Sequence, residues 1–439
     1  MALICLPVRS EKKRGAAMRE LSCDIVVIGA GPAGLAAAAA AKKQGDIRVI
    51  IIERDTAPGG ILQQCIHAGF GLYYFNEELT GPEYAGRFVA EAREAGVELM
   101  ADSMVLNILP EGGVICSNPK HGMVRVRAGA VVLAMGCRER TRFNLRIPGT
   151  RPAGVYTAGS AQRLMNRQNH MVGKKVVILG SGDIGMIMAR RMTLEGARVE
   201  AVVEIMDYLA GLTRNKVQCL DDFSIPLMLR HTVTRIEGER RIRGVWIAPV
   251  DEEKIPILSR ETFIACDTLL LSVGLLPENE LTRAAGIEIS PLTNGPVVNQ
   301  YMQTSRPDVF ACGNVVHVND LADNVSVESR HAGVAAAGYV MGRIPEDGEL
   351  IPCTAGNGVR YVCPQRILVH PAGCEDGPVR LYFRVNAPGG RTRLSAHLGD
   401  ALLASKTVQG VSPGEMEHLD INAANLAGTG ICVTAEEVE

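Results

Sequence analysis

The 439-residue sequence predicts an α/β protein in which one Rossmann-like dinucleotide-binding fold is interrupted by a second, followed by a small C-terminal β domain. Three observations lead to this prediction. A strand–glycine loop–helix–strand unit occurs twice, each copy closes on a similar apolar strand, and the region after residue 345 alternates apolar and polar residues. The expected organisation is a disordered extension at 1–21, the first fold at 22–145 and 281–345, the second fold at 146–280, and the β domain at 346–439.

The first unit begins with the β-branched run 24–28, which is typical of a buried parallel strand. The loop Gly29-Ala30-Gly31-Pro32-Ala33-Gly34 follows and opens an alanine-rich helix that extends to Gln44. A second apolar run at 48–52 ends at Glu53. This order predicts a β-α-β unit with an acid at the end of its second strand.

The second unit repeats this order at a period of about 150 residues, as expected for a duplicated fold. A strand is predicted at 175–179, and Gly180-Ser181-Gly182-Asp183-Ile184-Gly185 leads into a helix that extends to Leu194. The next strand, 197–203, ends at Glu204.

Other matches between the two copies support a duplicated fold. Glu53 follows the first glycine of its loop at the same spacing as Glu204 does in the second copy. The closing strands are 131–136 and 269–274. A β-meander is predicted before each of them, near 103–127 and 231–264.

The glycine positions have a mechanism in dinucleotide binding. Gly29 and Gly180 make the tight turn, Gly31 and Gly182 leave room for the pyrophosphate, and Gly34 and Gly185 allow the helix to pack on the strand. The N-terminus of each helix offers free N–H groups to the phosphates. Glu53 and Glu204 can each accept hydrogen bonds from a ribose. A carboxylate at position 204 repels a 2′-phosphate, and Arg198 comes too early to bind one, so the sequence favours NAD over NADP.

The rest of the chain predicts a return to the first fold and then the β domain. A strand at 309–311 leads to Cys312-Gly313-Asn314, and a helix is expected at 326–341. Alternating stretches at 360–369, 379–385 and 393–408 predict an antiparallel β domain.

Composition excludes several classes of protein. Lys and Arg total 46 against 48 Asp and Glu, and the chain has only eight Phe, nine Tyr and one Trp, so nucleic acid is not an expected partner. No uncharged apolar run reaches about 18 residues, so no spanning helix is predicted. None of the twelve cysteines has C-x-x-C spacing, so neither a metal site nor a cluster is predicted, and we expect a reducing cytoplasmic compartment.

Two dinucleotide folds in this order resemble the two-dinucleotide-binding-domain flavoproteins of the glutathione and thioredoxin reductase superfamily, over about residues 22–344. The resemblance implies that the first fold binds FAD, that the second binds NAD(P)H, and that Cys312-Gly313-Asn314 closes over the flavin ribityl chain. The superfamily usually has Asp where this chain has Asn314, which removes one charge near the phosphates.

A closer resemblance rests on the stretches 58–67, 81–85, 136–142 and 411–416. They are similar to bacterial NAD(P)/FAD-dependent oxidoreductases encoded beside glycerol-3-phosphate oxidases and a small cysteine-rich protein. More distant relatives are subunits of opine oxidases, hydrogen cyanide synthase and amino-acid dehydrogenases. Those relatives often carry clustered cysteines for a [2Fe–2S] cluster, whereas the C-terminal cysteines here are scattered. A cluster, if one takes part, is expected in another subunit.

The expected cofactor-binding residues follow from the motifs and the resemblance. For FAD they are Gly29, Gly31, Pro32, Ala33, Gly34, Glu53, Arg54, Gly60, Ile61, Val105, Ala134, Met135, Gly136, Gly313 and Asn314. For NAD they are Gly180, Gly182, Asp183, Ile184, Gly185, Glu204 and Gly274.

Catalytic side chains are less well defined. Disulfide reductases of the superfamily carry C-x-x-x-x-C or C-x-x-C pairs, whereas Cys65 stands alone, so it is either a redox thiol or a packing residue. His67, His317 and His331 lie by segments that wrap the flavin in the superfamily, and each is either an acid–base group or a structural side chain. Arg138, Arg140 and Arg142 either meet phosphates or an acidic partner, or line a solvated strand edge.

We therefore expect hydride exchange between NAD(H) and FAD, with electrons relayed to or from a partner flavoprotein dehydrogenase or a small iron–sulfur protein. Two alternatives stay open: a stand-alone NADH:acceptor oxidoreductase, and a flavin subunit whose second fold binds a nucleotide only structurally. A homo-oligomer is also compatible with the sequence.

Overall fold

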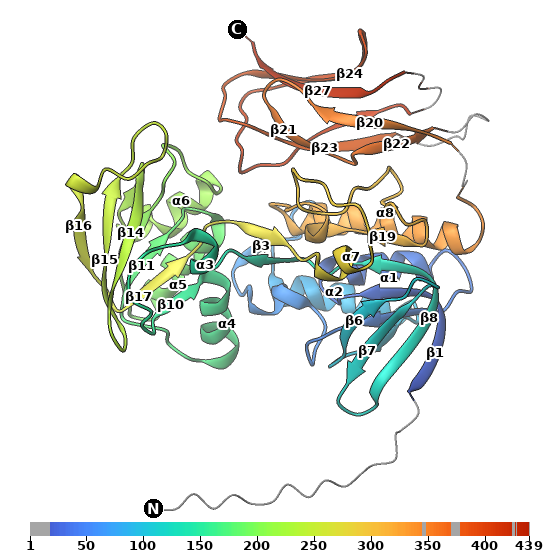
Figure 1. Ribbon diagram of the computed structural model, residues 1–439, viewed down its shortest axis with the longest axis horizontal. Helices are drawn as coiled ribbons and strands as arrows, with labels where there is room; N and C mark the ends of the chain where they lie inside the picture. Colours follow the sequence, from blue (N-terminus) through green and yellow to red (C-terminus); the bar gives the residue numbers. More distant parts are fainter. Residues whose placement is uncertain (1–17, 345–347, 370–377, 424–425, 427, 439) are drawn as a thin grey trace, which may run out of the picture.

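A computed structural model describes residues 18–344, 348–369, 378–423, 426 and 428–438. These residues form three bodies, which are the first fold, the second fold beside it, and the C-terminal strands above the first fold (Figure 1). The described chain therefore has the α/β architecture that the sequence predicts, with an additional β domain. None of its helices combines the length and apolar character needed to cross a bilayer.

The first fold is built on a seven-stranded sheet with the order β5-β2-β1-β8-β7-β6, in which β19 also pairs with β8. The strands are β1 (Arg19–Ile28), β2 (Val49–Ile52), β5 (Glu98–Met100), β6 (Met104–Ile108), β7 (Val114–Asn118), β8 (Gly122–Leu133) and β19 (Val309–Ala311). The predicted extension at 1–21 is wrong at its end, because Arg19–Leu21 belong to β1 and pair with Val124–Val126 of the long strand β8. Residues 1–17 lie outside the described chain.

Two helices from distant parts of the sequence pack against each other on this sheet. They are α1 (Pro32–Lys42) and α8 (Ala322–Val340), the second longer at its start than the predicted 326–341. The contact is close because it is made by small residues: the alanines of α1 are buried, and a Cβ at Gly333 would overlap the backbone of Ala37. The shorter elements of this fold are η1 (Gly60–Gln64), β3 (Ala68–Phe70), β4 (Leu79–Thr80), α2 (Gly81–Glu94), α7 (Glu280–Ala284) and η4 (Gly313–Val315).

The second fold has a parallel five-stranded sheet, β10-β17-β11-β12-β13. Its strands and helices are β10 (Val155–Thr157), α4 (Ala158–Gln168), β11 (Lys175–Leu179), α5 (Asp183–Leu194), β12 (Arg198–Val203), α6 (Thr213–Cys219), β13 (Leu227–Met228) and β17 (Thr268–Leu271). The predicted meander is β14 (His231–Gly238), β15 (Ile242–Pro249) and β16 (Thr262–Ala265). The chain enters this fold through β9 (Cys137–Glu139) and α3 (Arg142–Leu145) and leaves it through β18 (Leu275–Pro277), which pairs with β9.

The C-terminal domain has two sheets, β22-β20-β27-β24-β25 and β21-β23-β26, which enclose a core of their own. Its strands are β20 (Glu349–Ala355), β21 (Val359–Cys363), β22 (Arg366–Val369), β23 (Val379–Val385), β24 (Thr392–Leu398), β25 (Ala401–Val408), β26 (Glu417–Ile421) and β27 (Ile431–Glu437).

The prediction for this domain needs three corrections. The expected strand 360–369 is two strands, divided at Cys363–Pro364, a cis peptide bond at which the chain changes sheet. The stretch 393–408 is the hairpin of β24 and β25. The domain is not purely antiparallel, because β20 and β27 pair in parallel. These two strands come from opposite ends of the domain, so neighbouring sequence gives no sign of their pairing.

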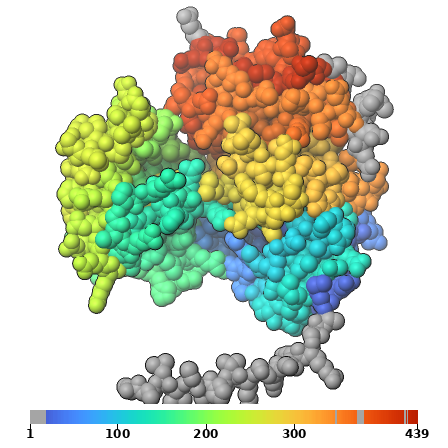
Figure 2. All heavy atoms as spheres, viewed as in Figure 1, coloured from blue at the N-terminus to red at the C-terminus, as the bar shows by residue number. Residues whose placement is uncertain are grey.

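The β domain is attached to the first fold by backbone and side-chain hydrogen bonds. The Val298 N–H donates to the side chain of Gln365, whose backbone N–H donates to the Val298 carbonyl. Gln300 makes a similar pair of bonds with the backbone of Leu368. In the space-filling view, the segment near residue 300 lies between the C-terminal strands and the remainder of the first fold (Figure 2). The domain therefore rests on the first fold through paired hydrogen bonds at Val298 and Gln300.

The contact between α1 and α8 gives a stability test. Gly333→Ala should lower the free energy of unfolding by about 1–3 kcal/mol, because the added methyl overpacks against Ala37. Gly86→Ala, in α2, is the matched control: open space surrounds that position, so the better helix propensity should raise stability by up to about 1 kcal/mol. Melting temperature and guanidinium midpoint would be measured for both variants. Equal shifts would contradict the assigned packing role of Gly333.

Candidate nucleotide-binding sites

The first glycine loop forms an open cradle at the start of α1. Gly29 has φ +105°, and a Cβ on Gly34 would overlap the Gly29 carbonyl, so both positions require glycine. A Cβ at Gly31, by contrast, would have no atom within 4 Å. Gly31 caps α1 without a side-chain hydrogen bond, and Pro32 occupies the first turn. Open space therefore faces unpaired N–H groups, as a bound pyrophosphate requires.

Glu53 lies directly behind this loop. Its carboxylate is buried and accepts N–H groups from Ala30 at 2.6 Å and Asp55 at 2.7 Å. These two bonds fix the loop relative to the end of β2. An ionised carboxylate has about four lone-pair sites, so acceptor capacity remains for a ribose.

The second glycine loop repeats this geometry. The Glu204 carboxylate accepts the backbone N–H of Ser181 at 2.8 Å and its hydroxyl at 2.7 Å. Gly180 has φ +98°, and a Cβ on Gly185 would clash with Ser272, directly after the closing strand β17. The predicted equivalence of Glu53 and Glu204 thus has a structural basis, since each binds the N–H after the first glycine.

The two loops differ in what covers them. In the second fold the chain after β12 folds back over the start of α5: Ala210 N–H donates to the Ser181 hydroxyl, and Leu212 N–H donates to the Asp183 carboxylate. A Cβ on Gly211 would lie 2.8 Å from the Asp183 nitrogen. A segment of the chain therefore lies against the start of α5, while a Cβ at Gly182 itself would meet only Ser272, at 3.4 Å.

The segment after β19 contacts the first cradle. Gly313 has φ +71°, and a Cβ there would lie 2.8 Å from the Ala33 side chain in the first turn of α1. The Asn314 amide donates to the Cys137 sulfur at 3.5 Å, and its oxygen accepts the Asn319 N–H at 2.9 Å. An ionised Asp could not donate to Cys137, so these two bonds account for the amide at this position.

One buried polar atom beside this segment has no hydrogen-bond partner among the described residues, the Asn319 Oδ1. The neighbouring Asp320 Oδ1 lies 3.7 Å from Arg384, and the side chains of His317 and Ser329 interact with Cys363 and Cys312. An unpaired buried oxygen is costly in a dry interior and points to a polar ligand or bound water. Together with the open cradle at Gly31, it fits a dinucleotide cofactor in the first fold.

His317 is a buried structural partner of Glu328. Its Nε2 lies 2.6 Å from one carboxylate oxygen of Glu328, and the other oxygen accepts the Gly313 N–H at 2.7 Å. Burial disfavours the imidazolium, but Cys363 and the Glu328 carboxylate outweigh it, so the pKa of His317 is raised. His331 Nε2 is paired with the Gln300 carbonyl.

Cys65 and His67 lie where the first fold meets the second. The Cys65 thiol is buried, donates to the Ile61 carbonyl at 3.3 Å and lies 3.8 Å from Gln162 of α4. Burial raises its pKa to about 12. His67 is half-buried, and burial lowers its pKa, with an opposing effect of Asp183. Cys65 thus has the surroundings of a packing residue, and His67 faces the second fold.

The contact between the two folds involves polar residues that the sequence did not single out. Gln64 donates to the Gly159 carbonyl and accepts, through its backbone carbonyl, from Asn166. Arg163 and Arg167 of α4 each reach the Asp55 carboxylate at 3.1 Å. Helix α4 is therefore bound to the loop after Glu53 and to η1. No local sequence pattern predicts these contacts, because each joins two single residues about a hundred positions apart.

Most other predicted cofactor residues surround the two loops. Ala134 and Met135 lie beside Gly29, and Gly60 lies against Gly31. Gly136 and Gly274 both have positive φ and open surroundings, and the side chain of Ile61 is exposed. Arg54 is exposed and Ile184 half-buried at the start of α5. Val105 is buried in β6 as part of the hydrophobic core.

The predicted arginine run has internal partners. Arg138 pairs with Glu278 and Glu280, and Arg142 donates to four carbonyls between Ile147 and Thr150. These contacts brace the crossing into the second fold, so the charges of Arg138 and Arg142 are used within the chain.

The burial of Cys65 can be tested chemically. In native protein at pH 8, iodoacetamide should leave Cys65 unmodified, because a thiol with a pKa of about 12 holds almost no thiolate. In guanidinium chloride it should react, and peptide mass spectrometry measures both states. Cys432, which is half-buried, is the internal comparison. Rapid native alkylation of Cys65 that abolishes flavin reduction would instead assign it a redox role.

Comparison with known proteins agrees with this geometry. A family model described as pyridine nucleotide-disulphide oxidoreductase matches residues 23–337 and so ends before the C-terminal β domain. An opine oxidase subunit of Rhizobium meliloti is 25% identical, over 79% of this chain and 77% of the relative. Hydrogen cyanide synthase subunit HcnB of Pseudomonas protegens is 26% identical, over 67% of this chain and 66% of the relative. The NAD(P)H sulfur oxidoreductase (CoA-dependent) of Pyrococcus abyssi is 25% identical, over 66% and 62%.

Solved structures show the same fold. Thioredoxin reductase of T. acidophilum has a TM-score of 0.60 and 22% identity, covering 72% of this chain and 98% of that one. L-Proline dehydrogenase from P. horikoshii has a TM-score of 0.52 and 18% identity, covering 73% and 56%. With two matching dinucleotide folds and a family match over most of its length, the chain belongs to the pyridine nucleotide-disulphide oxidoreductase family, whose members are NAD(P)H-linked flavoproteins that bind FAD.

Proposed function

We propose that the chain exchanges hydride between NAD(H) and FAD and relays the electrons to or from a partner subunit of a glycerol-3-phosphate or amine or amino-acid oxidising system. The observation that carries this proposal is the pair of glycine loops, each with a buried acid behind it, in two folds that pack together through α4 and η1. When bound, the flavin and the nicotinamide supply the hydride acceptor and donor.

The residues of the chain bind and orient in this proposal. The N–H groups at the start of α1 would hold the FAD pyrophosphate, with Glu53 at the ribose and Gly313–Asn314 over the chain between the phosphates and the ring. Asp183, Ile184 and the loop from Gly180 to Gly185 would hold NAD, with Glu204 at its ribose. The Glu204 carboxylate, buried at the end of β12, favours NAD over NADP. Arg198 would not bind a 2′-phosphate, because it forms an ion pair with Glu200 on the same strand.

We further propose that the chain is not a disulfide reductase. Cys65 is buried, its pKa is raised, and the neighbouring described groups are Ile61 and Gln162 rather than a second thiol. The electrons therefore need another outlet. The opine oxidase relative and HcnB are both named as subunits, which supports a partner flavoprotein dehydrogenase or a small iron–sulfur protein as that outlet.

One observation favours a second candidate. Ala210–Leu212 are hydrogen-bonded to Ser181 and Asp183 at the start of α5, so this loop borders the place where a nucleotide would enter the second fold. A loop that blocks this entry would make the second fold structural and leave electron transfer to the flavin side alone. A stand-alone NADH:acceptor oxidoreductase is the third possibility, and a partner experiment separates it from the first.

Paired valine substitutions test the cofactor assignment. Gly31→Val should yield colourless protein, because its side chain would fill the open cradle. Gly182→Val should retain FAD and lose anaerobic bleaching of the flavin by NADH. Absorbance at 450 nm before and after NADH addition measures both, with wild type as reference. Full FAD retention by Gly31→Val would contradict the first site, and unchanged bleaching of Gly182→Val the second.

Co-expression with the neighbouring genes tests the partner. Affinity purification through this chain should recover a second flavoprotein or a small cysteine-rich protein, identified by mass spectrometry. The electrons should then reach the partner's cofactor in a stopped-flow experiment. Purification alone, together with reduction of a soluble acceptor by NADH at a normal enzyme rate of about 1–1,000 per second, would favour the stand-alone enzyme.

A further inference from the structure

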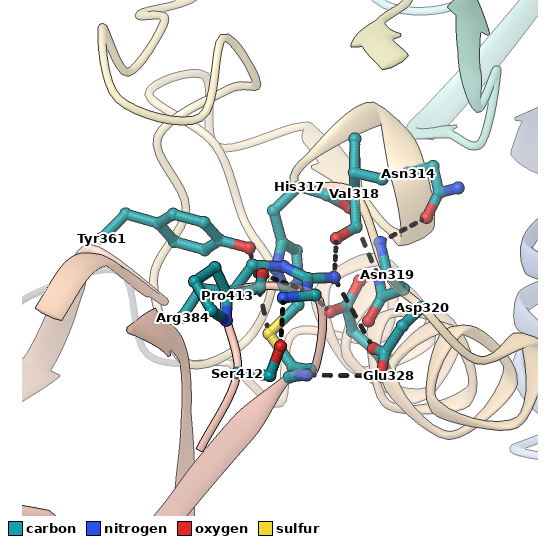
Figure 3. A network of polar contacts seen from close by, with 12 residues as sticks. Asn314, His317, Val318, Asn319, Asp320, Glu328, Tyr361, Arg384, Ser412 and Pro413 are labelled. Carbon is teal, nitrogen blue, oxygen red and sulfur yellow. Dashed lines mark hydrogen bonds and ion pairs between the residues drawn. The ribbon is translucent and has the colours of Figure 1, made fainter. Parts of the chain in front are cut away.

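Arg384 of strand β23 contacts two other parts of the chain at once (Figure 3). Its guanidinium donates to the Val318 carbonyl at 3.0 Å and to the Pro413 carbonyl at 3.0 Å, and it lies 3.7 Å from the Asp320 carboxylate. Val318 and Asp320 belong to the segment after η4 of the first fold. Pro413 belongs to the turn 412–416 of the β domain.

This junction is buried and charged. The side chains of Arg384 and Asp320 are only 11% and 9% exposed. The Met416 N–H donates to the second oxygen of Asp320 at 3.3 Å, which ties the turn to the same carboxylate. A planar guanidinium presents several donors in a fixed arrangement, so one side chain can hold two carbonyls and an acid in register. Loss of Arg384 would leave Asp320 buried without its counter-ion.

On the flavin side, a short series of hydrogen bonds and contacts connects Arg384 with the first glycine loop. Arg384 holds Val318, and the next residue, Asn319, donates its N–H to Asn314. Asn314 follows Gly313, which lies against the first turn of α1. Arg384 therefore fixes the far end of the segment whose near end closes the first site.

On the nicotinamide side, the contact runs through the turn 412–416. A Cβ on Gly414 would lie 2.6 Å from the Ala210 carbonyl, so the turn rests directly on the loop that covers α5. Ala210 in turn donates to Ser181, which is bound to Glu204. Burial raises the pKa of the neighbouring Glu415, and the carboxylates of Asp320, Glu417 and Asp183 add to this effect.

We propose that Arg384 is a positioning residue for both nucleotide sites: it holds 312–320 at the flavin site and 412–416 against the loop over the NAD site. The C-terminal β domain thereby helps to position both nucleotide sites. This inference rests on the proposed function, because it uses the two nucleotide assignments. It goes beyond it by assigning the β domain, which lies outside the family match, a part in binding.

The same strand provides a matched control. Arg380, also in β23, makes a bidentate ion pair with Asp420, with N–O distances of 2.7 and 2.9 Å. Both side chains are 42% exposed, and the pair lies within the β domain. Ion pairs between exposed side chains contribute little to folding stability. Arg380→Gln therefore removes the same chemical group from the same strand without touching either site.

The test compares Arg384→Gln, Arg384→Lys, Arg380→Gln and Gly414→Leu. FAD affinity is measured by titrating apoprotein and following flavin fluorescence, NADH affinity by half-saturation of anaerobic flavin reduction, and folding by melting temperature. Arg384→Gln should weaken both nucleotides about tenfold or more. Arg384→Lys should recover part of the loss, because it keeps the charge but not the planar fork. Arg380→Gln should stay within about twofold of wild type.

Gly414→Leu tests the NAD site separately from the FAD site. It also keeps the inference testable if Arg384→Gln fails to fold. Its side chain pushes on Ala210, so NADH affinity should fall while FAD affinity stays at the wild-type value. Folded Arg384→Gln with both affinities equal to those of Arg380→Gln would overturn the inference, as would a Gly414→Leu variant that binds NADH normally. Wild-type flavin that NADH fails to reduce would instead refute the proposed function, and the FAD titrations would still test the flavin half of the inference.

Discussion

The structure depends on a buried carboxylate that accepts the N–H after the first glycine of each loop. Glu53 does this for Ala30, and Glu204 for Ser181. The bond joins the end of the second strand to the turn after the first, so each nucleotide loop takes its shape before any ligand arrives. A buried carboxylate is tolerated only when it is hydrogen-bonded, and here the backbone of the site supplies those bonds. The rest of the chain is arranged around two such pre-shaped loops.

The sequence predicted what local patterns encode. Glycine loops, apolar strands and the acids after them are short-range features, and the structure has both copies in the predicted order. The sequence did not reveal pairs such as Glu328 with His317 or Arg384 with Asp320. A single charged residue has no periodic pattern, and it meets its partner only when distant segments fold together. The early start of β1 at Arg19 was missed for a related reason: its pairing partner, β8, lies a hundred residues away.

The two folds share a framework but not an accessible surface. The first loop faces open space at Gly31, whereas Ala210–Leu212 fold over the start of the equivalent helix in the second. The covering segment is held from two sides, because Leu209 packs against the core of the second fold and the turn at Gly414 rests on the Ala210 carbonyl. Its position therefore depends on the β domain as well as on the second fold.

The discontinuity of the first fold has a consequence for its synthesis. Strand β1 leaves the ribosome early, but its sheet lacks β19 and its helix α1 lacks α8 until residues beyond Ala322 have been made. The second fold is continuous in sequence and can become compact while the first still waits for these pieces. The alanine-rich face of α1, which α8 finally covers, is therefore exposed for most of translation. Its small side chains present little apolar area per residue, which limits the risk of aggregation during that interval.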